Sequence, residues 1–386
     1  MTTESNKQNR LLAMLGAAHS LNHSLFLIAP PLLTLIMDDL GVSKFVIGTV
    51  GTVASFIYGA GALLGGPLGD KIGETKTIML FLALSGVSTF LMLLATNVLV
   101  YASVLVLIAL WASLYHPTAN SLISKAFRVK TAEAMGLHGV GGTLGVMLTP
   151  TIAWFIGSLF GWRLAFIFFG ALCIVLAVAL AKNVKKSENK AVSATKFLDA
   201  FKIHELRIVL AFNIMIGLFM KGVEYYFPTY LKEVKLIDPM WASIAYTLVL
   251  ASGVPAQWIG GKTADLFGSK KVLIATSLGV VLSLLALQFS PIVLLGVALF
   301  IVLYGVSFYA HQPALNSLTG LCCPEEMRGT VYGVFFFTSF GIGSLSQSVA
   351  GYFIDNFGWQ PAFLLLTLFA FLALTISFRL PRKETN

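Results

Sequence analysis

The chain has 386 residues, of which 57% are hydrophobic and 11% charged, and its formal net charge at pH 7 is +9. Soluble domains carry about 25% charged residues, so this composition excludes an ordinary soluble protein and is typical of a helical protein that crosses the membrane several times. The polar start MTTESNKQNR precedes an apolar run that is too long for a signal peptide, so we expect that run to be retained as a transmembrane helix.

Transmembrane helices are predicted wherever about 20 consecutive residues are mostly apolar. Gly and Pro inside such segments are tolerated where neighbouring helices satisfy the backbone groups that they free. The expected fold class is therefore an all-α membrane protein. Reading the chain in order gives about twelve segments, namely 11–37, 46–69, 77–97, 99–124, 133–158, 163–183, 207–231, 241–264, 272–290, 292–318, 327–351 and 361–380.

A polar, basic stretch at 181–207 divides these segments into two sets of six. We predict an N-terminal six-helix bundle (1–183), a cytoplasmic linker loop (184–206) and a C-terminal six-helix bundle (207–386). Three sequence matches between the halves, in the same order and about 196 residues apart, indicate a duplicated six-helix unit. The matches are HPTANSLIS from His116 with QPALNSLTG from Gln312, GWRLAF from Gly161 with GWQPAF from Gly358, and GGPLGDKIGETK from Gly65 with GGKTADLFGSKK from Gly260.

The positive charge is unevenly distributed over the loops. One set of loops and both termini are rich in Lys and Arg, whereas the opposite loops hold only Lys44, Arg163, Lys232 and Lys235. Because basic loops stay in the cytoplasm, we expect both termini and the linker there, with the chain in the cytoplasmic (inner) membrane. The excess positive charge then fixes the orientation of the chain in the membrane and contacts anionic lipid. We therefore expect no nucleic-acid partner.

Two loops at equivalent places in the halves carry the same motif. They resemble the G-x-x-x-D-[RK]-x-G-[RK] loop of the major facilitator superfamily, and they lie between segments 2 and 3 and segments 8 and 9, where that family has it. The resemblance covers nearly the whole chain and implies the superfamily fold of twelve transmembrane helices in two pseudo-symmetric six-helix bundles. In the family this loop acts in gating, which implies a gating role for Gly66, Asp70, Lys71, Gly73, Gly261, Asp265 and Gly268.

The motif departs from the family pattern at two positions, since Glu74 and Leu266 stand where basic residues are usual. Two pieces of the first half, LYHPTAN (114–120) and AHSLNH (18–23), are similar to pieces of fosmidomycin-resistance-type exporters. Drug/proton antiporters usually carry an Arg in segment 4 and a G-P-x-x-G-G pattern in segment 5. Neither occurs here, which disfavours a general multidrug transporter.

Placing an Arg, Lys or Asp side chain at the centre of a transmembrane helix costs about 2.5–3.5 kcal/mol of insertion free energy. Ionisable side chains in such helices therefore usually face a cavity or a partner. The cores of segments 3, 6, 9 and 12 contain none. In the superfamily, segments 1, 4, 7 and 10 line the central cavity, and here these four segments hold His19, His23, His116, Lys221, Glu224 and His311. The resemblance therefore implies a polar cavity, in which His23 of the first half corresponds to Lys221 of the second.

On this basis we predict two functional sets. Proton coupling is assigned to Glu224 and His23. Substrate binding is assigned to His19, Asn22, His23, His116, Lys221, Tyr225 and His311.

Each assignment has an alternative. Lys221 and Glu224 are three residues apart and would also fit a pair that neutralises itself on one helix face. His19 and His23 are four apart and would suit a metal ion, but no third ligand at supporting spacing is visible, so we predict no metal and no cofactor. His116, before Pro117, would equally cap a kinked helix. His138 is interpreted as a packing or gating residue.

Basic groups in the spans suit charge-assisted hydrogen bonds to carboxylate, phosphonate or sulfonate. We therefore predict a secondary active transporter that moves a small organic anion across the cytoplasmic membrane by alternating access, coupled to H⁺. The alternative is a proton-driven exporter of drugs or amphipathic compounds. An enzyme is not expected, because no P-loop, H-E-x-x-H or G-x-S-x-G pattern is present. The expected partners are the substrate, H⁺ and the lipid bilayer, and the expected state is a monomer.

Overall fold

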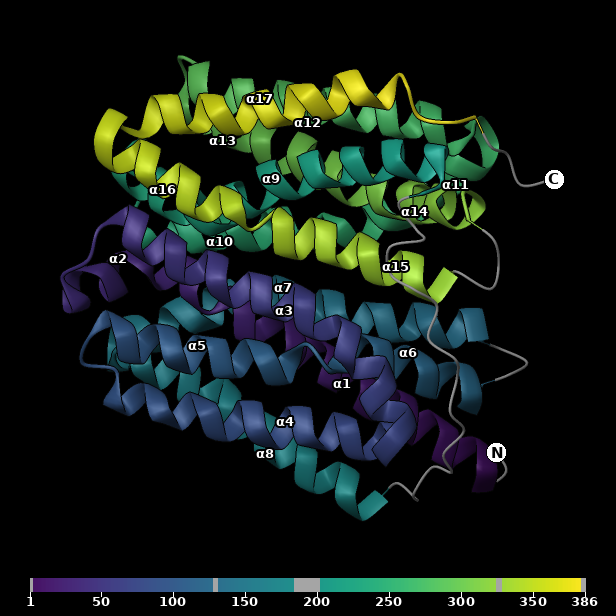
Figure 1. Ribbon diagram of the computed structural model, residues 1–386. Coiled ribbons are helices and arrows are strands. Elements are labelled where there is room, and N and C mark those ends of the chain that lie inside the picture. The colour runs from purple at the N-terminus through teal and green to yellow at the C-terminus, as the bar shows by residue number, and fades with distance from the viewer. Residues whose placement is uncertain (1–2, 128–130, 184–201, 324–327, 383–386) are drawn as a thin grey trace. The chain divides into compact units, whose positions relative to one another are not determined.

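The computed structural model describes residues 3–127, 131–183, 202–323 and 328–382, which are helical almost throughout and contain no strand (Figure 1). By their contacts the residues form two compact units. Unit 1 comprises Met1–Val42 and Val53–Ser193, and unit 2 comprises Ser43–Thr52 and Ala194–Asn386. Most of the predicted linker loop, residues 184–201, lies outside the described residues.

Unit 1 is built from apolar helices, several of which are interrupted by a short break. Ile28 separates the first two helices, and Pro30 and Pro31 follow in the first turn of the second, where a missing N–H costs no hydrogen bond. The helices are α1 (Thr3–Leu27), α2 (Ala29–Leu40), α3 (Lys44–Ile72, of which the residues up to Thr52 belong to unit 2), α4 (Glu74–Phe90), the 3₁₀ turn η1 (Leu91–Leu94), α5 (Val98–Ala112), α6 (Tyr115–Ala126), α7 (Thr131–Phe160) and α8 (Trp162–Asn183).

A second break, at Ser113 and Leu114, divides α5 from α6. It leaves His116 and Pro117 in the first turn of α6. The predicted segments 1 and 4 are thus each made of two helices, and His116 lies next to the second break, whereas His19 and His23 lie within α1.

Helices α1 and α7 form the most extensive contact of unit 1, and glycines make it possible. A Cβ on Gly141 would lie 2.5 Å from Gly16 Cα, and one on Gly142 would lie 2.4 Å from His19 Cε1. Glycine is therefore required for the backbone of α1 and the ring of His19 to approach α7 this closely.

Unit 2 repeats the pattern of interrupted helices. Its interruptions include Ser252 and two π-helical segments, η3 and η5. The elements are α9 (His204–Glu233), α10 (Pro239–Ala251), α11 (Gly253–Phe267), α12 (Ser269–Phe289), α13 (Val293–Leu299), η3 (Phe300–Tyr304), α14 (Gly305–Leu321), α15 (Arg328–Phe336), η5 (Phe337–Ile342), α16 (Leu345–Phe357) and α17 (Trp359–Ser377).

Glycines at matching places in the two sequence halves adopt the same backbone conformation. Gly73 and Gly268 follow α3 and α11 with φ of 96° and 85°, and Gly161 and Gly358 follow α7 and α16 with φ of 93° and 86°. Only glycine adopts such angles at little cost. The repeats predicted from the sequence thus end their helices in the same way.

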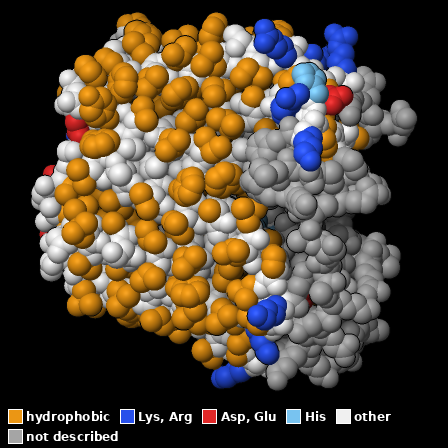
Figure 2. All heavy atoms as spheres, viewed as in Figure 1, with side chains coloured by type: hydrophobic (Ala, Val, Ile, Leu, Met, Phe, Trp, Pro, Cys, Tyr) orange, Lys and Arg blue, Asp and Glu red, His pale blue; other side chains and the backbone are white. Residues whose placement is uncertain are grey.

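Eleven helical stretches within the described residues are long and apolar enough to cross a membrane. The remaining predicted segment, 327–351, corresponds to α15, η5 and α16, which are not among those eleven. Hydrophobic side chains cover most of the face drawn in Figure 2. Helices of segments 6, 9 and 12, whose cores hold no ionisable side chain, carry exposed apolar side chains at helical spacing, including Phe168, Leu172 and Val175 on α8, Leu278, Leu282 and Leu285 on α12, and Leu364, Leu368 and Phe371 on α17.

The glycine contact between α1 and α7 predicts opposite effects of two neighbouring substitutions. Gly141→Ala places a methyl group against the backbone of Gly16, and such overpacking typically costs about 1–3 kcal/mol. Gly139→Ala meets nothing within 4 Å and improves helix propensity. We expect thermal unfolding in detergent to show a lower Tm for Gly141→Ala and an unchanged or higher Tm for Gly139→Ala. Equal Tm values would contradict the close approach.

Candidate functional site

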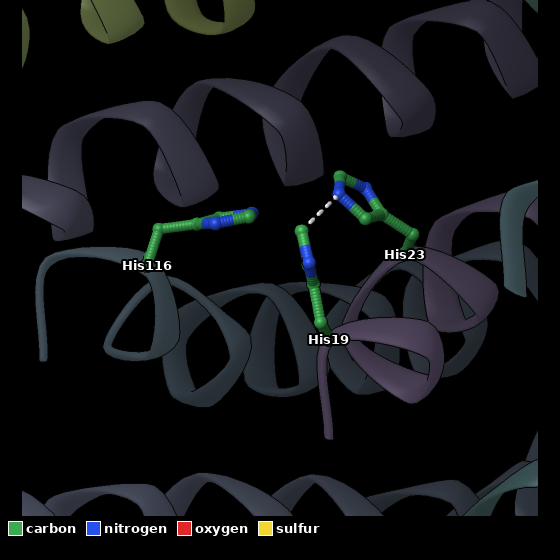
Figure 3. Close-up of side chains that lie close together, drawn as sticks. All are labelled: His19, His23 and His116. Carbon is green, nitrogen blue, oxygen red and sulfur yellow. Dashed lines mark hydrogen bonds between the residues drawn. The ribbon is translucent and has the colours of Figure 1, made fainter. Parts of the chain in front are cut away.

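Three histidines of unit 1 converge from two helices (Figure 3). His19 and His23 lie one turn apart on α1, and His116 comes from the first turn of α6. The Nε2 atoms of His19 and His23 are 3.0 Å apart, and the ring centroid of His116 lies 5.0 Å from that of His19 and 5.2 Å from that of His23. All three side chains are partly buried. We call these residues the histidine cluster.

A fourth histidine, His138 of α7, fixes the orientation of His19. Nδ1 of His19 donates to the His138 carbonyl oxygen at 2.9 Å, and the two rings stack with centroids 4.2 Å apart. Nε2 of His138 is 2.8 Å from the Tyr115 hydroxyl, which donates to the carbonyl oxygen of Leu15 at 2.5 Å. Because Nδ1 of His19 is the donor, its lone pair in the neutral ring is on Nε2, which faces His23.

Asn22 lies on the same helix but outside the histidine cluster. It is fully buried, its amide nitrogen donates to the Ala112 carbonyl at 2.8 Å, and its amide oxygen accepts from the Tyr58 hydroxyl at 2.8 Å. Asn22 therefore joins α1 to the end of α5 and to α3, next to the break that positions His116.

In unit 2, Lys221 and Glu224 pair on one face of α9. The Lys221 ammonium donates to a Glu224 carboxylate oxygen at 3.1 Å, and their side chains are 15% and 19% exposed. The ammonium also lies 4.4 Å from the ring centroid of Phe340, a cation–π contact. The pairing that the sequence left open is therefore present in this structure.

Beside Glu224 is a cavity of about 10 Å³, roughly the room that one water needs. Tyr246 of α10, Tyr304 of η3 and Tyr309 of α14 line it together with Glu224 and apolar side chains. The hydroxyls of Tyr246 and Tyr304 are buried without a hydrogen-bond partner. A buried orphaned hydroxyl is costly, so the cavity is suited to a small hydrogen-bonding guest such as water.

Two other residues predicted to bind substrate are buried in unit 2. The Tyr225 hydroxyl donates to the carbonyl oxygen of Ile47 at 2.9 Å. His311 donates from Nδ1 to the carbonyl oxygen of Phe308 and packs against its ring. Both of these hydrogen bonds go to backbone carbonyls and not to Lys221 or Glu224.

The loops of the gating motif are partly described. The surroundings of Gly66 and of the Asp70 side chain are not described, whereas Lys71 and Asp265 are exposed. Glu74, which replaces a basic residue of the family pattern, is 2% exposed. It forms an ion pair with Lys125 and accepts a hydrogen bond from Ser121 at 3.1 Å. Lys125 of α6 thus neutralises the acid that stands at this position of the motif.

Sequence reasoning missed the partners that complete both sites. His138 was interpreted as packing or gating, and its contact with His19 joins positions 119 apart in the chain. Nothing in the sequence around Tyr246 indicated that this residue lies at a functional site. The sequence offered one hint, because Tyr304 precedes and Tyr309 lies within the GVSFYAHQP stretch that contains His311.

Comparison with known proteins finds transporters. A family model described as "Major Facilitator Superfamily" matches residues 12–348. The chain is 25% identical over 358 residues to the probable sulfoacetate transporter SauU of Cupriavidus necator, covering 84% of this chain and 82% of that one. It is 26% identical over 382 residues to the multidrug resistance protein MdtG of Escherichia fergusonii, covering 93% and 90%.

Among solved structures, the fold is similar to that of a bacterial homolog to the human lysosomal transporter Spinster. The TM-score is 0.81 with 15% sequence identity, and the match covers 97% of both chains. At this identity the similarity shows the fold alone.

The contacts of Asn22 predict a structural role that can be measured. Asn22→Ala removes the hydrogen bonds to the Tyr58 hydroxyl and to the Ala112 carbonyl, and each buried hydrogen bond contributes about 0.5–1.5 kcal/mol to stability. We expect a clearly lower Tm in detergent. The matched control is Asn356→Ala, because Asn356 is exposed and bonds only within its own helix. An unchanged Tm for Asn22→Ala would contradict this interpretation.

Proposed function

Because the chain belongs to the major facilitator superfamily and is a multi-pass membrane transporter, we propose that it moves a small organic anion across the cytoplasmic membrane by alternating access, coupled to H⁺. The observation that carries this proposal is the Lys221–Glu224 pair within the membrane-spanning part of α9. Such a pair is expensive inside a membrane, so a function is the default interpretation.

The charge balance of the described span interiors supports an anionic substrate. Glu224 is an acid, whereas the groups that are basic or can become so are Lys221 and the histidines of the two units, His19, His23, His116, His138 and His311. Ammonium and imidazolium groups form strong hydrogen bonds with carboxylates and sulfonates. We assign substrate contact to Lys221 and to the histidine cluster, each within its own unit.

The pair also suggests how H⁺ and anion are coupled. While Glu224 is ionised, it holds the Lys221 ammonium, and an anion has to compete with it. A proton on Glu224 removes that competition and leaves a buried cation without its counter-ion, which is strongly unfavourable. An anion then supplies the missing charge. The groups facing Glu224 from α10, η3 and α14 are the neutral tyrosines 246, 304 and 309, so no other acid among the residues lining the cavity replaces it.

The relatives agree with this substrate class in part. SauU is named as a probable transporter of sulfoacetate, which is a small organic anion. MdtG is named for multidrug resistance, which favours the second candidate, a proton-driven exporter of amphipathic compounds. The buried Lys221 favours the anion, because a broad apolar selectivity has no use for a cation held in the span.

Transport assays with purified protein in proteoliposomes distinguish the organic-anion transporter from the exporter of amphipathic compounds. We expect an inward H⁺ gradient to drive uptake of a labelled sulfonate or carboxylate such as sulfoacetate, and unlabelled organic anions to compete. A thermal-shift screen of the same compounds at two pH values would show stabilisation by the bound anion. Stabilisation and transport restricted to neutral or cationic amphipaths would overturn the proposal in favour of the exporter.

Lys221→Ala tests the assigned anion contact. Removing one partner of a buried charge pair typically costs about 2–5 kcal/mol, so we expect kcat/KM for the anion to fall about a hundredfold or more. Lys232→Ala, in the last turn of the same helix, is the matched control and is expected to transport normally. Full anion transport by Lys221→Ala would refute the contact.

Glu224→Gln tests the coupling step. The amide keeps the shape of the side chain but cannot hold the ammonium by charge or exchange a proton. We expect anion counterflow to persist, because Lys221 remains available, while accumulation driven by a pH gradient is lost. Counterflow is measured without a gradient and accumulation with one, in the same vesicles. Retained gradient-driven accumulation would exclude Glu224 as the proton carrier.

A further inference from the structure

The histidine cluster has the composition and geometry of a metal site. The ligand nitrogens of His19, His23 and His116 all lie within 4.8 Å of one another, and Figure 3 shows the three rings facing a common point. A tetrahedral zinc ion with Zn–N distances of about 2.0–2.1 Å separates its ligand nitrogens by about 3.4 Å. His19 and His23 are already 3.0 Å apart, and a rotation of the His116 ring closes the remaining gap.

The surroundings of His19 support metal binding independently of these distances. Metal-binding histidines almost always donate their second ring N–H to a carbonyl or carboxylate group, which fixes the ring and points the lone pair at the ion. Nδ1 of His19 makes this bond to the His138 carbonyl, and Gly142 leaves the space in which the ring lies. His19 is therefore held with its lone pair directed into the cluster.

The contact between His19 and His23 is also one that a metal ion would replace. Two Nε2 atoms 3.0 Å apart need one proton between them. Protonating all three rings instead would place like charges in contact. A divalent ion takes the place of that proton, which moves to the other ring nitrogen of His23, and accepts the lone pairs of all three imidazoles, which metal binding requires in their neutral form.

We propose that His19, His23 and His116 bind a divalent transition-metal ion such as Zn²⁺ within unit 1. All-imidazole ligands favour Zn²⁺, Cu²⁺ or Ni²⁺ over Mg²⁺ and Ca²⁺, which prefer oxygen. Three protein ligands leave a fourth position for water or an anion. The bound ion ties α1 to α6 across the break that follows α5, and it competes with protons for the same nitrogens. This inference does not rest on the proposed function.

The experiment uses the full chain, purified in detergent with an affinity tag that contains no histidine and treated with a chelator. Bound Zn²⁺ is measured by equilibrium dialysis and Tm by thermal unfolding, without substrate or gradient. We expect about one Zn²⁺ per chain, a Tm that rises with Zn²⁺ but not with Mg²⁺, and weaker binding at lower pH. Three further groups pack against the histidine cluster and have to be considered when binding changes with pH. They are His138, Tyr115 and Tyr58.

Two ligand variants and one control define the site. His23→Asn and His116→Asn each remove one imidazole and are expected to weaken Zn²⁺ binding at least about tenfold. His204→Asn is the control, because His204 is exposed at the start of α9. Co²⁺ added to the unaltered chain should give the intense visible absorption of a tetrahedral site, a readout that does not depend on the folding of any variant.

Zn²⁺ binding that is equal in the unaltered chain and both ligand variants would overturn the proposal, as would a Co²⁺ spectrum of octahedral type. Neither result affects the anion contact assigned to Lys221, which is measured separately, whereas a bound ion would replace the direct contact between the histidine cluster and the substrate. Conversely, loss of that transport function leaves the metal site standing.

Discussion

An ionisable side chain within a membrane-spanning helix must find its partners in the protein, because lipid offers none. Both polar sites obey this constraint. In unit 1 the histidines bond to one another and, through His138 and Tyr115, to backbone carbonyls. In unit 2 Lys221 is satisfied by Glu224 and Phe340. In each site these side chains already have partners within the protein. A proton, an anion or a metal ion that binds there therefore replaces one of these partners.

Interrupted helices position these partners. The break between α5 and α6 lets His116 enter the space beside α1, and Asn22 secures the break by bonding to Ala112. The π-helical segment η3 supplies Tyr304, and η5 supplies Phe340. Irregular backbone of this kind is common where a helix serves a functional site. The interruptions of the helices therefore position the side chains of the two polar sites.

The two units share their framework but not their polar chemistry. Equivalent glycines end equivalent helices with the same positive φ, while the matched sequences place Gln312 opposite His116 in the repeat. Gln312 bonds to Gln257 at 3.0 Å, so the second unit uses a neutral amide pair where the first uses an imidazole. Duplication preserved the turns, which depend on glycine, and left the side chains free to diverge into an imidazole site and an ammonium–carboxylate site.

The sequence by itself determined the membrane-spanning class, eleven of the twelve predicted segments and the superfamily, because hydropathy, glycine turns and segment order are local properties of the chain. It also identified His19, His23, His116, Lys221 and Glu224, since any ionisable residue in an apolar run is conspicuous. Only the tertiary structure decided which side chains from different helices contact one another. The contact of His138 with His19, the third imidazole from α6 and the tyrosines around Glu224 join residues from different helices, and no spacing along a single helix encodes them.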